Sequence, residues 1–372
     1  MPVQPFLSAC TNKQGVKNDN THPVVIIGAG AAGLISGYLL KQQGVSVKIL
    51  EAASNFGGRM KRTTDFADFP IPLGAEWIHV KPNILSEIVN DDSVNIDVKV
   101  EKYNPDIDYA LYEGEKISIE QIEMNKESKF VNSTWFDFFE QYIVPSVEKH
   151  IIYGAVVEKI DYLADEIKIE TFDKIYLASR VVLTVPVKVL QQNKLTFIPE
   201  LPKSKQDAIN SVKVWSGFKA FIEFSDKFYP ALIGFNPTTN DGEKLYYDAT
   251  YGQNSNQHIL GLFAVGNESL SYLRLTDEER VKYILHELDK IFDGKASAHY
   301  VKHIFQNWDI EPHINGAYIR DNEDWTAVKK LGESVDGRLF FAGDAYTDGE
   351  DWSAVHNAVH SAKRAVQAIM GS

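Results

Sequence analysis

The stretch Val24-Val25-Ile26-Ile27-Gly28-Ala29-Gly30-Ala31-Ala32-Gly33-Leu34 decides the fold of this 372-residue chain. Four branched apolar residues in succession are typical of a strand that is buried on both faces of a parallel sheet. Gly28 permits the tight turn after this strand, Gly30 lets the backbone approach a pyrophosphate, and Gly33 lets the next helix pack closely on the strand. The stretch therefore predicts a strand–turn–helix unit that binds a dinucleotide.

The residues that follow extend this unit and select its ligand. The helix is expected to end at Gly44, a typical C-terminal cap, and residues 45–50 read as a second strand. Glu51 ends that strand, 23 residues after Gly28. A carboxylate at this point accepts hydrogen bonds from both ribose hydroxyls, and it would repel a 2′-phosphate. The pattern therefore favours a dinucleotide other than NADP.

The composition of the chain excludes some classes of partner and site. The net charge is −13, with 38 basic and 51 acidic residues, which argues against a nucleic-acid partner and is compatible with a small cationic substrate. No apolar run is long and pure enough to span a bilayer. The chain has one cysteine, so an internal disulfide and a structural zinc site made of cysteines are both excluded, and no metal site is expected.

The N-terminus leaves two interpretations open. Leu7-Ser8-Ala9-Cys10 resembles the processing box of bacterial lipoproteins, and the polar residues 11–22 follow it as a tether would. Residues 1–6, however, contain no Lys or Arg and no apolar segment, so no complete export signal is present. We expect a disordered N-terminus over residues 1–21 on a cytoplasmic protein, with an envelope lipoprotein as the alternative.

Two further motifs carry a resemblance to a known family. Asn55-Phe56-Gly57-Gly58-Arg59 follows Glu51 closely, and Leu73-Gly74-Ala75-Glu76-Trp77-Ile78-His79 comes shortly afterwards. With them the sequence resembles the flavin-containing amine oxidases, which include monoamine oxidases, polyamine oxidases, L-amino-acid oxidases and lysine-specific histone demethylases. The resemblance covers most of the chain after residue 22, and it implies FAD as the cofactor.

The resemblance also implies which residues hold the cofactor. Val157 would contact the adenine through its backbone, and Asp344 would lie near the ribityl-phosphate region, where the family usually has Glu. The start of the helix after Ser353 would face flavin N1 and O2, because unpaired N–H groups at a helix N-terminus stabilise negative charge. The full expected set is Gly28, Gly30, Ala31, Gly33, Glu51, Ala52, Gly58, Arg59, Gly74, Ala75, Glu76, Trp77, Val157, Gly343, Asp344, Ser353, Ala354 and Val355.

Three residues are the implied catalytic set: Lys219, Trp308 and Tyr318. Lys219 would hold a water against flavin N5, although Gly217 precedes it by two residues rather than the family's four. The alternative is an exposed lysine on a half-buried strand. Tyr318 would form one wall of the substrate's aromatic cage.

Two alanines mark departures from monoamine oxidases. Ala317 stands where those enzymes bond the flavin to a cysteine, so the FAD is expected to be noncovalent. Ala354 stands at the second cage aromatic, which leaves Trp352 or Trp215 to close the cage. His79 is equally compatible with a structural role, and no general base is assigned.

Together these observations predict an α/β protein with a Rossmann-like FAD-binding domain and an inserted α+β substrate domain. The expected FAD-binding domain comprises residues 22–81, 150–208 and 311–372, and the substrate domain residues 82–149 and 209–310. The implied reaction oxidises an amine to an imine with O2 as acceptor and releases H2O2, with polyamines slightly favoured. The alternatives are an L-amino-acid oxidase, a desaturase of the same superfamily, or a nonenzymatic FAD-bound scaffold.

Overall fold

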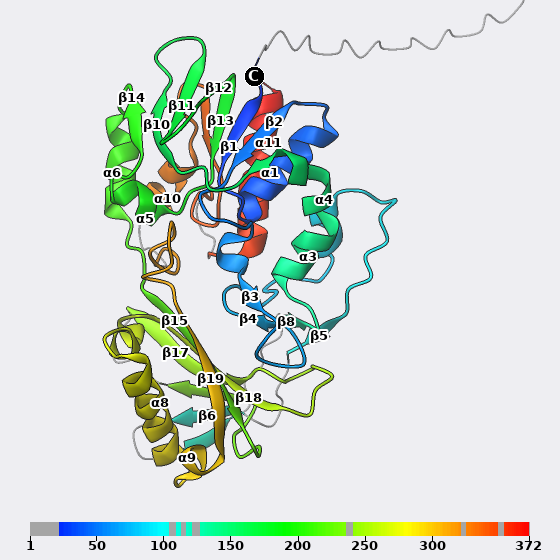
Figure 1. Ribbon diagram of the computed structural model, residues 1–372, viewed down its shortest axis with the longest axis vertical. Coiled ribbons are helices and arrows are strands. Elements are labelled where there is room, and N and C mark those ends of the chain that lie inside the picture. Colours follow the sequence, from blue (N-terminus) through cyan, green and yellow to red (C-terminus); the bar gives the residue numbers. More distant parts are fainter. Residues whose placement is uncertain are drawn as a thin grey trace, which may run out of the picture.

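Two sheet-based parts stacked end to end make up the molecule (Figure 1). This computed structural model describes residues 22–103, 109–112, 117–120, 127–235, 241–320, 325–348 and 353–371. The expectations for Cys10 and Trp352 fall outside these residues. Within the described part of the chain, no helix combines the length and the apolar character needed to cross a membrane.

A five-stranded parallel sheet forms the centre of the upper part. Its order, β20-β13-β1-β2-β9, places β1, the strand before the glycine-rich turn, in the middle. Val24 and Ile26 of β1 pack into one hydrophobic core, whereas Val25 and Ile27 pack into another. Both faces of β1 are therefore covered, as its unbroken apolar run predicts. The strands are β1 Val24–Ile27, β2 Val47–Leu50, β9 Ile151–Ile152, β13 Arg180–Leu183 and β20 Leu339–Phe341.

Helices cover one face of this sheet and share a single core with it. Helix α1 packs along α11, the last helix, and apolar residues of α2, α3 and α4 complete the cluster. Residues 82–149 were expected to belong wholly to the substrate domain. Instead, their helices pack on the cofactor domain, whereas their strands β6 and β7 join the lower sheet. The helices are α1 Ala31–Gln42, α2 Ile84–Val89, α3 Trp135–Tyr142, α4 Val144–Val147 and α11 Val355–Met370.

A second layer covers the opposite face. It consists of a four-stranded sheet in the order β12-β11-β10-β14 and three helices, which share a core with Val25 and Ile27. Lys205 donates to three backbone carbonyls at and after the end of α10, Lys330, Leu331 and Glu333. The elements are β10 Val157–Asp161, β11 Ile167–Thr171, β12 Ile175–Ala178, β14 Thr196–Ile198, α5 Val187–Gln191, α6 Lys203–Ser211 and α10 Trp325–Gly332.

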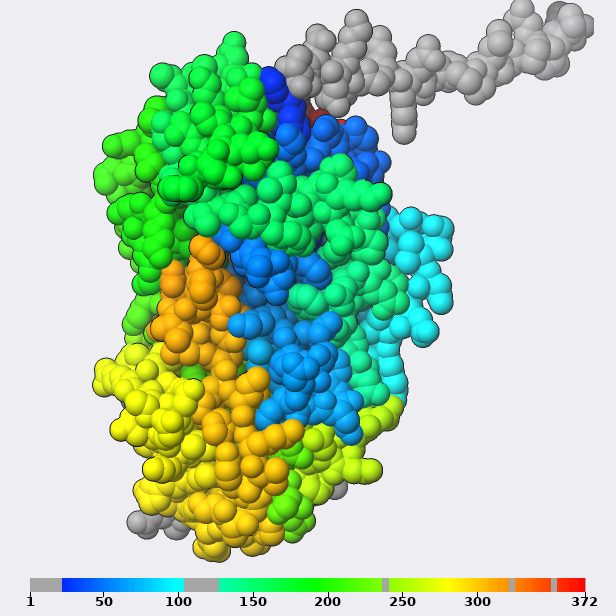
Figure 2. All heavy atoms as spheres, in the orientation of Figure 1, coloured from blue at the N-terminus to red at the C-terminus, as the bar shows by residue number. Residues whose placement is uncertain are grey.

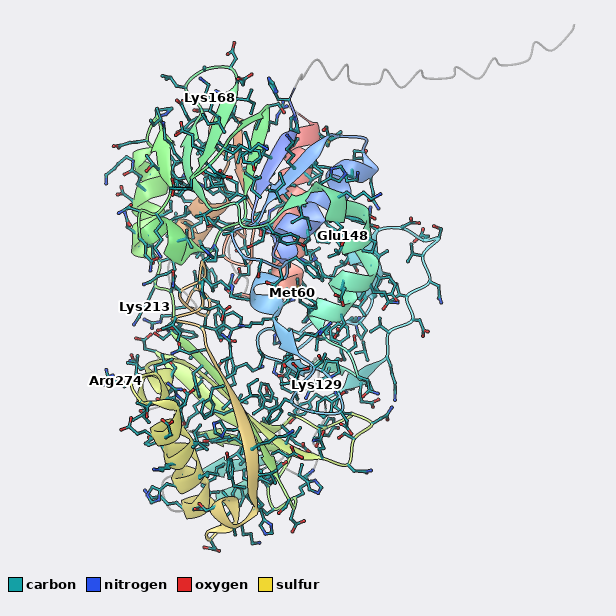
Figure 3. The ribbon with its side chains drawn as sticks, in the orientation of Figure 1. Met60, Lys129, Glu148, Lys168, Lys213 and Arg274 are labelled. Atoms are coloured by element: carbon teal, nitrogen blue, oxygen red, sulfur yellow. The ribbon has the colours of Figure 1, made fainter. Side chains whose placement is uncertain are left out.

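A seven-stranded sheet, in the order β19-β15-β18-β17-β16-β6-β7, forms the lower part. After β6 and β7, the chain returns to this sheet following α6, near Lys213, which is labelled in Figure 3. Phe218, Ala220 and Ile222 of β15 face a core that includes α8, so Lys219 and Phe221 face the other side of the sheet. The elements are β6 Tyr109–Tyr112, β7 Ile117–Glu120, β15 Gly217–Phe224, β16 Leu232–Phe235, β17 Gly242–Asp248, β18 His258–Gly266, β19 Tyr300–Asn307, α7 Leu270–Leu273, α8 Asp277–Ile291 and α9 Lys295–His299.

Short segments join the two parts. Figure 2 shows the junction from one face, where the blue segment after β2 lies beside the orange segment after β19. Lys61 and Glu311 link these two segments through an ion pair of 2.8 Å. The short elements are 3-10 helices at Gly58–Met60, Glu148–His150 and Asn267–Ser269, and strands β3 Arg62–Thr63, β4 Ile71–Pro72, β5 Val100–Lys102 and β8 Ser128–Phe130.

The close contact between α1 and the preceding turn gives a first prediction. A Cβ atom on Gly33 would lie 1.9 Å from the carbonyl oxygen of Gly28, whereas a Cβ on Gly30 would meet nothing within 4 Å. We therefore expect Gly33→Ala to lower the free energy of unfolding of the apoprotein by about 1–3 kcal/mol or more, as overpacking does. Gly30→Ala is the matched control, and it should leave that stability nearly unchanged. Urea denaturation of both variants measures the difference, and equal stabilities would contradict the assignment of Gly33 to close packing.

Candidate cofactor and substrate cavity

A cavity of about 1380 Å³ lies between the two parts of the molecule. Its lining contains every expected cofactor residue except Gly33, which instead packs against the turn at Gly28. It also contains Lys219, Trp308 and Tyr318. The cofactor residues in the lining are Gly28, Gly30, Ala31, Glu51, Ala52, Gly58, Arg59, Gly74, Ala75, Glu76, Trp77, Val157, Gly343, Asp344, Ser353, Ala354 and Val355.

Glu51 is fixed at the carboxyl ends of the parallel strands. Its Oε2 accepts the N–H of Ala29 at 2.6 Å, and its Oε1 accepts the N–H of Ala53 at 2.8 Å. A carboxylate oxygen has two lone pairs, so each oxygen retains acceptor capacity toward the cavity. The backbone of the turn thus orients the side chain that the sequence assigns to the ribose.

The termini of two long helices provide donors for an anionic cofactor. The N-cap residues of helices α1 and α11 are Gly30 and Ala354, and neither supplies a side-chain cap to the first-turn N–H groups. The hydroxyl oxygen of Ser353 is also buried without a hydrogen-bond partner. Unpaired donors of this kind are suited to phosphate and to a charged ring edge. The residues present therefore fit FAD, whose two phosphates and flavin ring need such donors.

Arg59 ties three separate segments together beside the cavity. Its guanidinium donates to both carboxylate oxygens of Asp344, at 3.0 and 2.5 Å, and to the carbonyl oxygen of Ala317 at 2.5 Å. A bidentate arginine–carboxylate pair has a fixed planar geometry. Asp344 thereby orients Arg59, and Arg59 fixes the backbone immediately before Tyr318.

Tyr318 and Trp215 line the cavity in contact with each other. Their ring centroids are 5.8 Å apart in an edge arrangement, and the indole N–H of Trp215 donates to Asp241 at 2.8 Å. A Cβ on Gly217 would come within 2.6 Å of the Ala317 Cβ, so these two small residues allow close packing here. Trp215 thus stands beside Tyr318 rather than opposite it in the lining of the cavity.

Trp308 also lines the cavity, where it packs between Gly74 and strand β15. A Cβ on Gly74 would come within 3.0 Å of the Trp308 ring, and the backbone N–H of Trp308 donates to the carbonyl oxygen of Gly217 at 2.9 Å. The ring is 5% exposed. It therefore presses the segment around Gly74 against strand β15.

Lys219 is buried rather than exposed, so the alternative of an exposed strand lysine is wrong. Its ammonium donates to the carbonyls of Pro72 and Gly74, at 3.0 and 3.1 Å, and to the carboxylate of Glu76 at 2.8 Å. An ammonium has three donors, and all three are used on protein atoms. This geometry differs from the implied role of Lys219 as the ligand of a water. It also directs the Glu76 carboxylate toward lysine rather than cofactor.

Several charged residues of the cavity were missed by sequence reasoning. Glu243, at the start of β17, is exposed and lines the cavity on the same strand face as Leu245. Glu127 lines it too and pairs with His79 at 2.8 Å, beside His356 of α11. Period-two alternation along residues 243–247 is a signal that could have identified Glu243. No local pattern connects Glu127 to His79, because 48 residues separate them.

His356 gives a prediction for stability in acid. Burial, and then the neighbouring His79 and His360, lower the pKa of His356 to about 4 from 6.5. Between these pH values His356 is protonated in the unfolded chain but remains neutral in the folded protein. The free energy of unfolding therefore falls as the pH decreases from about 6.5 to about 4. We expect His356→Gln to flatten the fall in Tm over this window. The control is His286→Gln on the exposed face of α8, which should keep the wild-type slope. A slope unchanged in His356→Gln would contradict this account.

Comparisons with known proteins agree with this geometry. Residues 26–91 match the family model described as NAD(P)-binding Rossmann-like domain. The chain is 23% identical to probable polyamine oxidase 4 of Arabidopsis thaliana, over 92% of this chain and 86% of that protein. It is 21% identical to human lysine-specific histone demethylase 2, over 88% of this chain and 51% of that protein.

Solved structures show the same fold. Putrescine oxidase bound to putrescine superposes with a TM-score of 0.75 and 15% identity, covering 94% of this chain and 99% of that one. Cyclohexylamine oxidase from Brevibacterium oxydans gives a TM-score of 0.77 at 14% identity, with coverage of 94% and 99%. Residues 139–370, more than half of the chain, match the model of the flavin containing amine oxidoreductases. The protein therefore belongs to the flavin containing amine oxidoreductase family, and its cofactor is FAD.

Proposed function

We propose that the protein oxidises a primary or secondary amine that carries a second ammonium group, such as a diamine or polyamine. The observation that carries this proposal is an exposed carboxylate, Glu243, in the lining of the cavity that also contains Tyr318. The amine loses two hydrogens to become an imine, and O2 takes them up as H2O2. Water then hydrolyses the imine to a carbonyl compound and a smaller amine or ammonia.

The register of the lower sheet sets the span of the substrate region. Gly217 of β15 lies opposite Val265 of β18, and Val265 lies opposite Glu243 of β17. Adjacent strands are about 4.8 Å apart, so Glu243 lies about 10 Å from Gly217 along this row. Gly217 itself packs on Ala317, next to Tyr318. This span suits an extended diamine or triamine chain with one end beside Tyr318 and the other at Glu243.

Bound FAD supplies the redox chemistry by accepting hydride from the amine α-carbon and passing two electrons to O2. The protein orients the substrate. The rings of Tyr318 and Trp215 form one side of the reacting end, and Phe263 and Val265 provide apolar surface that excludes water. Because its donors are all occupied by Pro72, Gly74 and Glu76, we propose that Lys219 acts by fixing the segment that carries them, and that Trp308 acts by packing.

Two further considerations support an amine with a second cation over an α-amino acid. The named relatives include polyamine oxidases, and a putrescine oxidase shares the fold. Recognition of an amino acid needs a cation for its carboxylate, and arginine is the usual choice. The arginines in the described lining, Arg59 and Arg62, are already paired with Asp344 and Asp137.

The function is tested by anaerobic mixing of the FAD-loaded protein with an amine panel. We expect spermine, spermidine, putrescine or acetylated spermine to bleach the flavin absorbance, and air to restore it with release of H2O2. Bleaching by phenylethylamine or tyramine alone would keep the amine oxidase class and reject the second-cation preference. Bleaching by L-amino acids alone would favour the amino-acid oxidases. A flavin that no amine reduces would support the desaturase or scaffold alternatives.

Glu243→Gln tests the assignment of the second ammonium. An exposed ion pair is worth up to about 1 kcal/mol, so KM for the preferred diamine or polyamine should rise about fivefold. The value of kcat should change little, and turnover of phenylethylamine, where measurable, should be unaffected. The matched control is Glu200→Gln, an exposed glutamate outside the cavity. An unchanged KM for the diamine in Glu243→Gln would reject Glu243 as the anchor.

A further inference from the structure

Three charged side chains are buried together beside the cavity: Glu76, Lys129 and Lys219. Their side chains are 4%, 5% and 7% exposed, respectively. Glu76 Oε2 pairs with Lys219 at 2.8 Å, and its Oε1 pairs with Lys129 at 3.0 Å. Lys129, labelled in Figure 3, belongs to β8 and lies where the upper part meets the seven-stranded sheet. One carboxylate therefore serves two lysines from distant parts of the chain.

Burial lowers the pKa of Lys219, and Glu76 opposes this shift, but the geometry around the Lys219 nitrogen is that of an ammonium. Its nitrogen faces three oxygens, those of Pro72, Gly74 and Glu76. A neutral amine has two donors and one lone pair, so it would direct that lone pair at an oxygen. The ammonium satisfies all three acceptors. Lys219 and Glu76 thus form an ion pair whose two charges cancel.

Lys129 brings a second positive charge to the same carboxylate. Its ammonium lies 5.2, 6.0 and 5.4 Å from the ring centroids of Trp77, Tyr103 and Tyr247, and it donates to the Ala249 carbonyl at 3.3 Å. Aromatic faces attract a cation, most strongly where water is excluded. Three aromatic rings therefore surround this one buried ammonium.

The carboxylate between the lysines stays ionised. Burial opposes ionisation of Glu76, but Lys219, Lys129 and the hydroxyl of Tyr247 outweigh it and hold the Glu76 pKa at about 2. The void behind the cluster measures about 10 Å³, room for about one water molecule. The cluster therefore carries two positive charges and one negative charge with little water to screen them.

We propose that Lys129 gives this cluster its net positive charge, and that this charge favours reduction of the FAD held in the adjacent cavity. Glu76 cancels Lys219, so the unbalanced charge derives from a lysine that does not line the cavity. Lys129 is thus a positioning and electrostatic residue rather than a catalytic one. The inference depends on FAD binding as described above, and it concerns how readily the bound flavin accepts electrons.

The test is the midpoint potential of the bound flavin, measured by anaerobic titration against reference dyes at pH 7.5. A unit charge acting over about 10 Å at an effective dielectric constant near 20 changes an equilibrium constant about tenfold. Lys129→Met should therefore disfavour two-electron reduction about tenfold, which lowers the potential by about 30 mV. Lys129→Arg keeps the charge and should keep the potential.

A double variant separates charge from packing. Glu76→Gln with Lys129→Met leaves Lys219 as the sole charge of the cluster, so it restores the net charge and should restore the potential. Tyr247→Phe removes a hydrogen bond to Glu76 without changing the charge, and it should leave the potential near that of the wild type. The remote control is Lys203→Met, at a lysine whose side chain is 80% exposed.

The outcomes distinguish this inference from the proposed function. FAD content and Tm are measured first, and a wild-type protein that cannot bind FAD would overturn the cofactor assignment itself. A yellow Lys129→Met protein with the wild-type potential would overturn this inference alone, as would a double variant with a potential no higher than that of Lys129→Met. If Lys129→Met does not fold, Glu76→Gln provides a second test, because it removes the negative charge and should shift the flavin potential in the opposite direction. Its potential should rise above the wild-type value at pH 6, and an equal or lower potential would overturn the proposal.

Discussion

The cavity depends on the contacts of a single guanidinium group. Arg59 follows β2, Asp344 follows β20, and Ala317 precedes the aromatic wall at Tyr318, so these contacts join segments 258 and 285 residues apart. The side chains of Arg59 and Asp344 are 28% and 15% exposed, which limits screening of the pair by water. Because the bidentate geometry is planar and directional, it fixes the cofactor module and the substrate wall relative to each other. The segments that line the cavity therefore meet at Arg59.

The dinucleotide module could be predicted from sequence because its determinants are local. The apolar run of β1, the glycines and the spacing to Glu51 all lie within 28 residues, and each follows from backbone geometry. The segment from residue 82 to 149 could not be divided in the same way. Its helices have apolar faces that pack on α1, and its strands extend a sheet whose other members come more than 80 residues later. Which partner each face meets is decided by tertiary packing, which a local pattern does not contain.

Local patterns also fail to predict which individual side chains meet in the cavity. Alternation along β15 predicts that Lys219 and Phe218 face opposite sides, but it does not say which side is covered. Helix α8 covers the face of Phe218, and the segment carrying Pro72 and Glu76 covers the face of Lys219. Motif resemblance located Glu76 and Lys219 at the cavity. It could not show that they pair with each other, or that Lys129 shares the carboxylate.

The charges of the cavity are arranged in two zones with different effects on an amine. Glu243 is exposed and lines the cavity, and we propose that it attracts an ammonium group, as the acidic balance of the chain also would. The inner end lies beside the buried lysines, where an ammonium is disfavoured by like charge and by desolvation. Hydride can leave the α-carbon only when the adjacent nitrogen has a free lone pair. In the function proposed above, a substrate with two amino groups would meet both conditions at once, because one nitrogen would stay charged at Glu243 while the other lost its proton beside Tyr318.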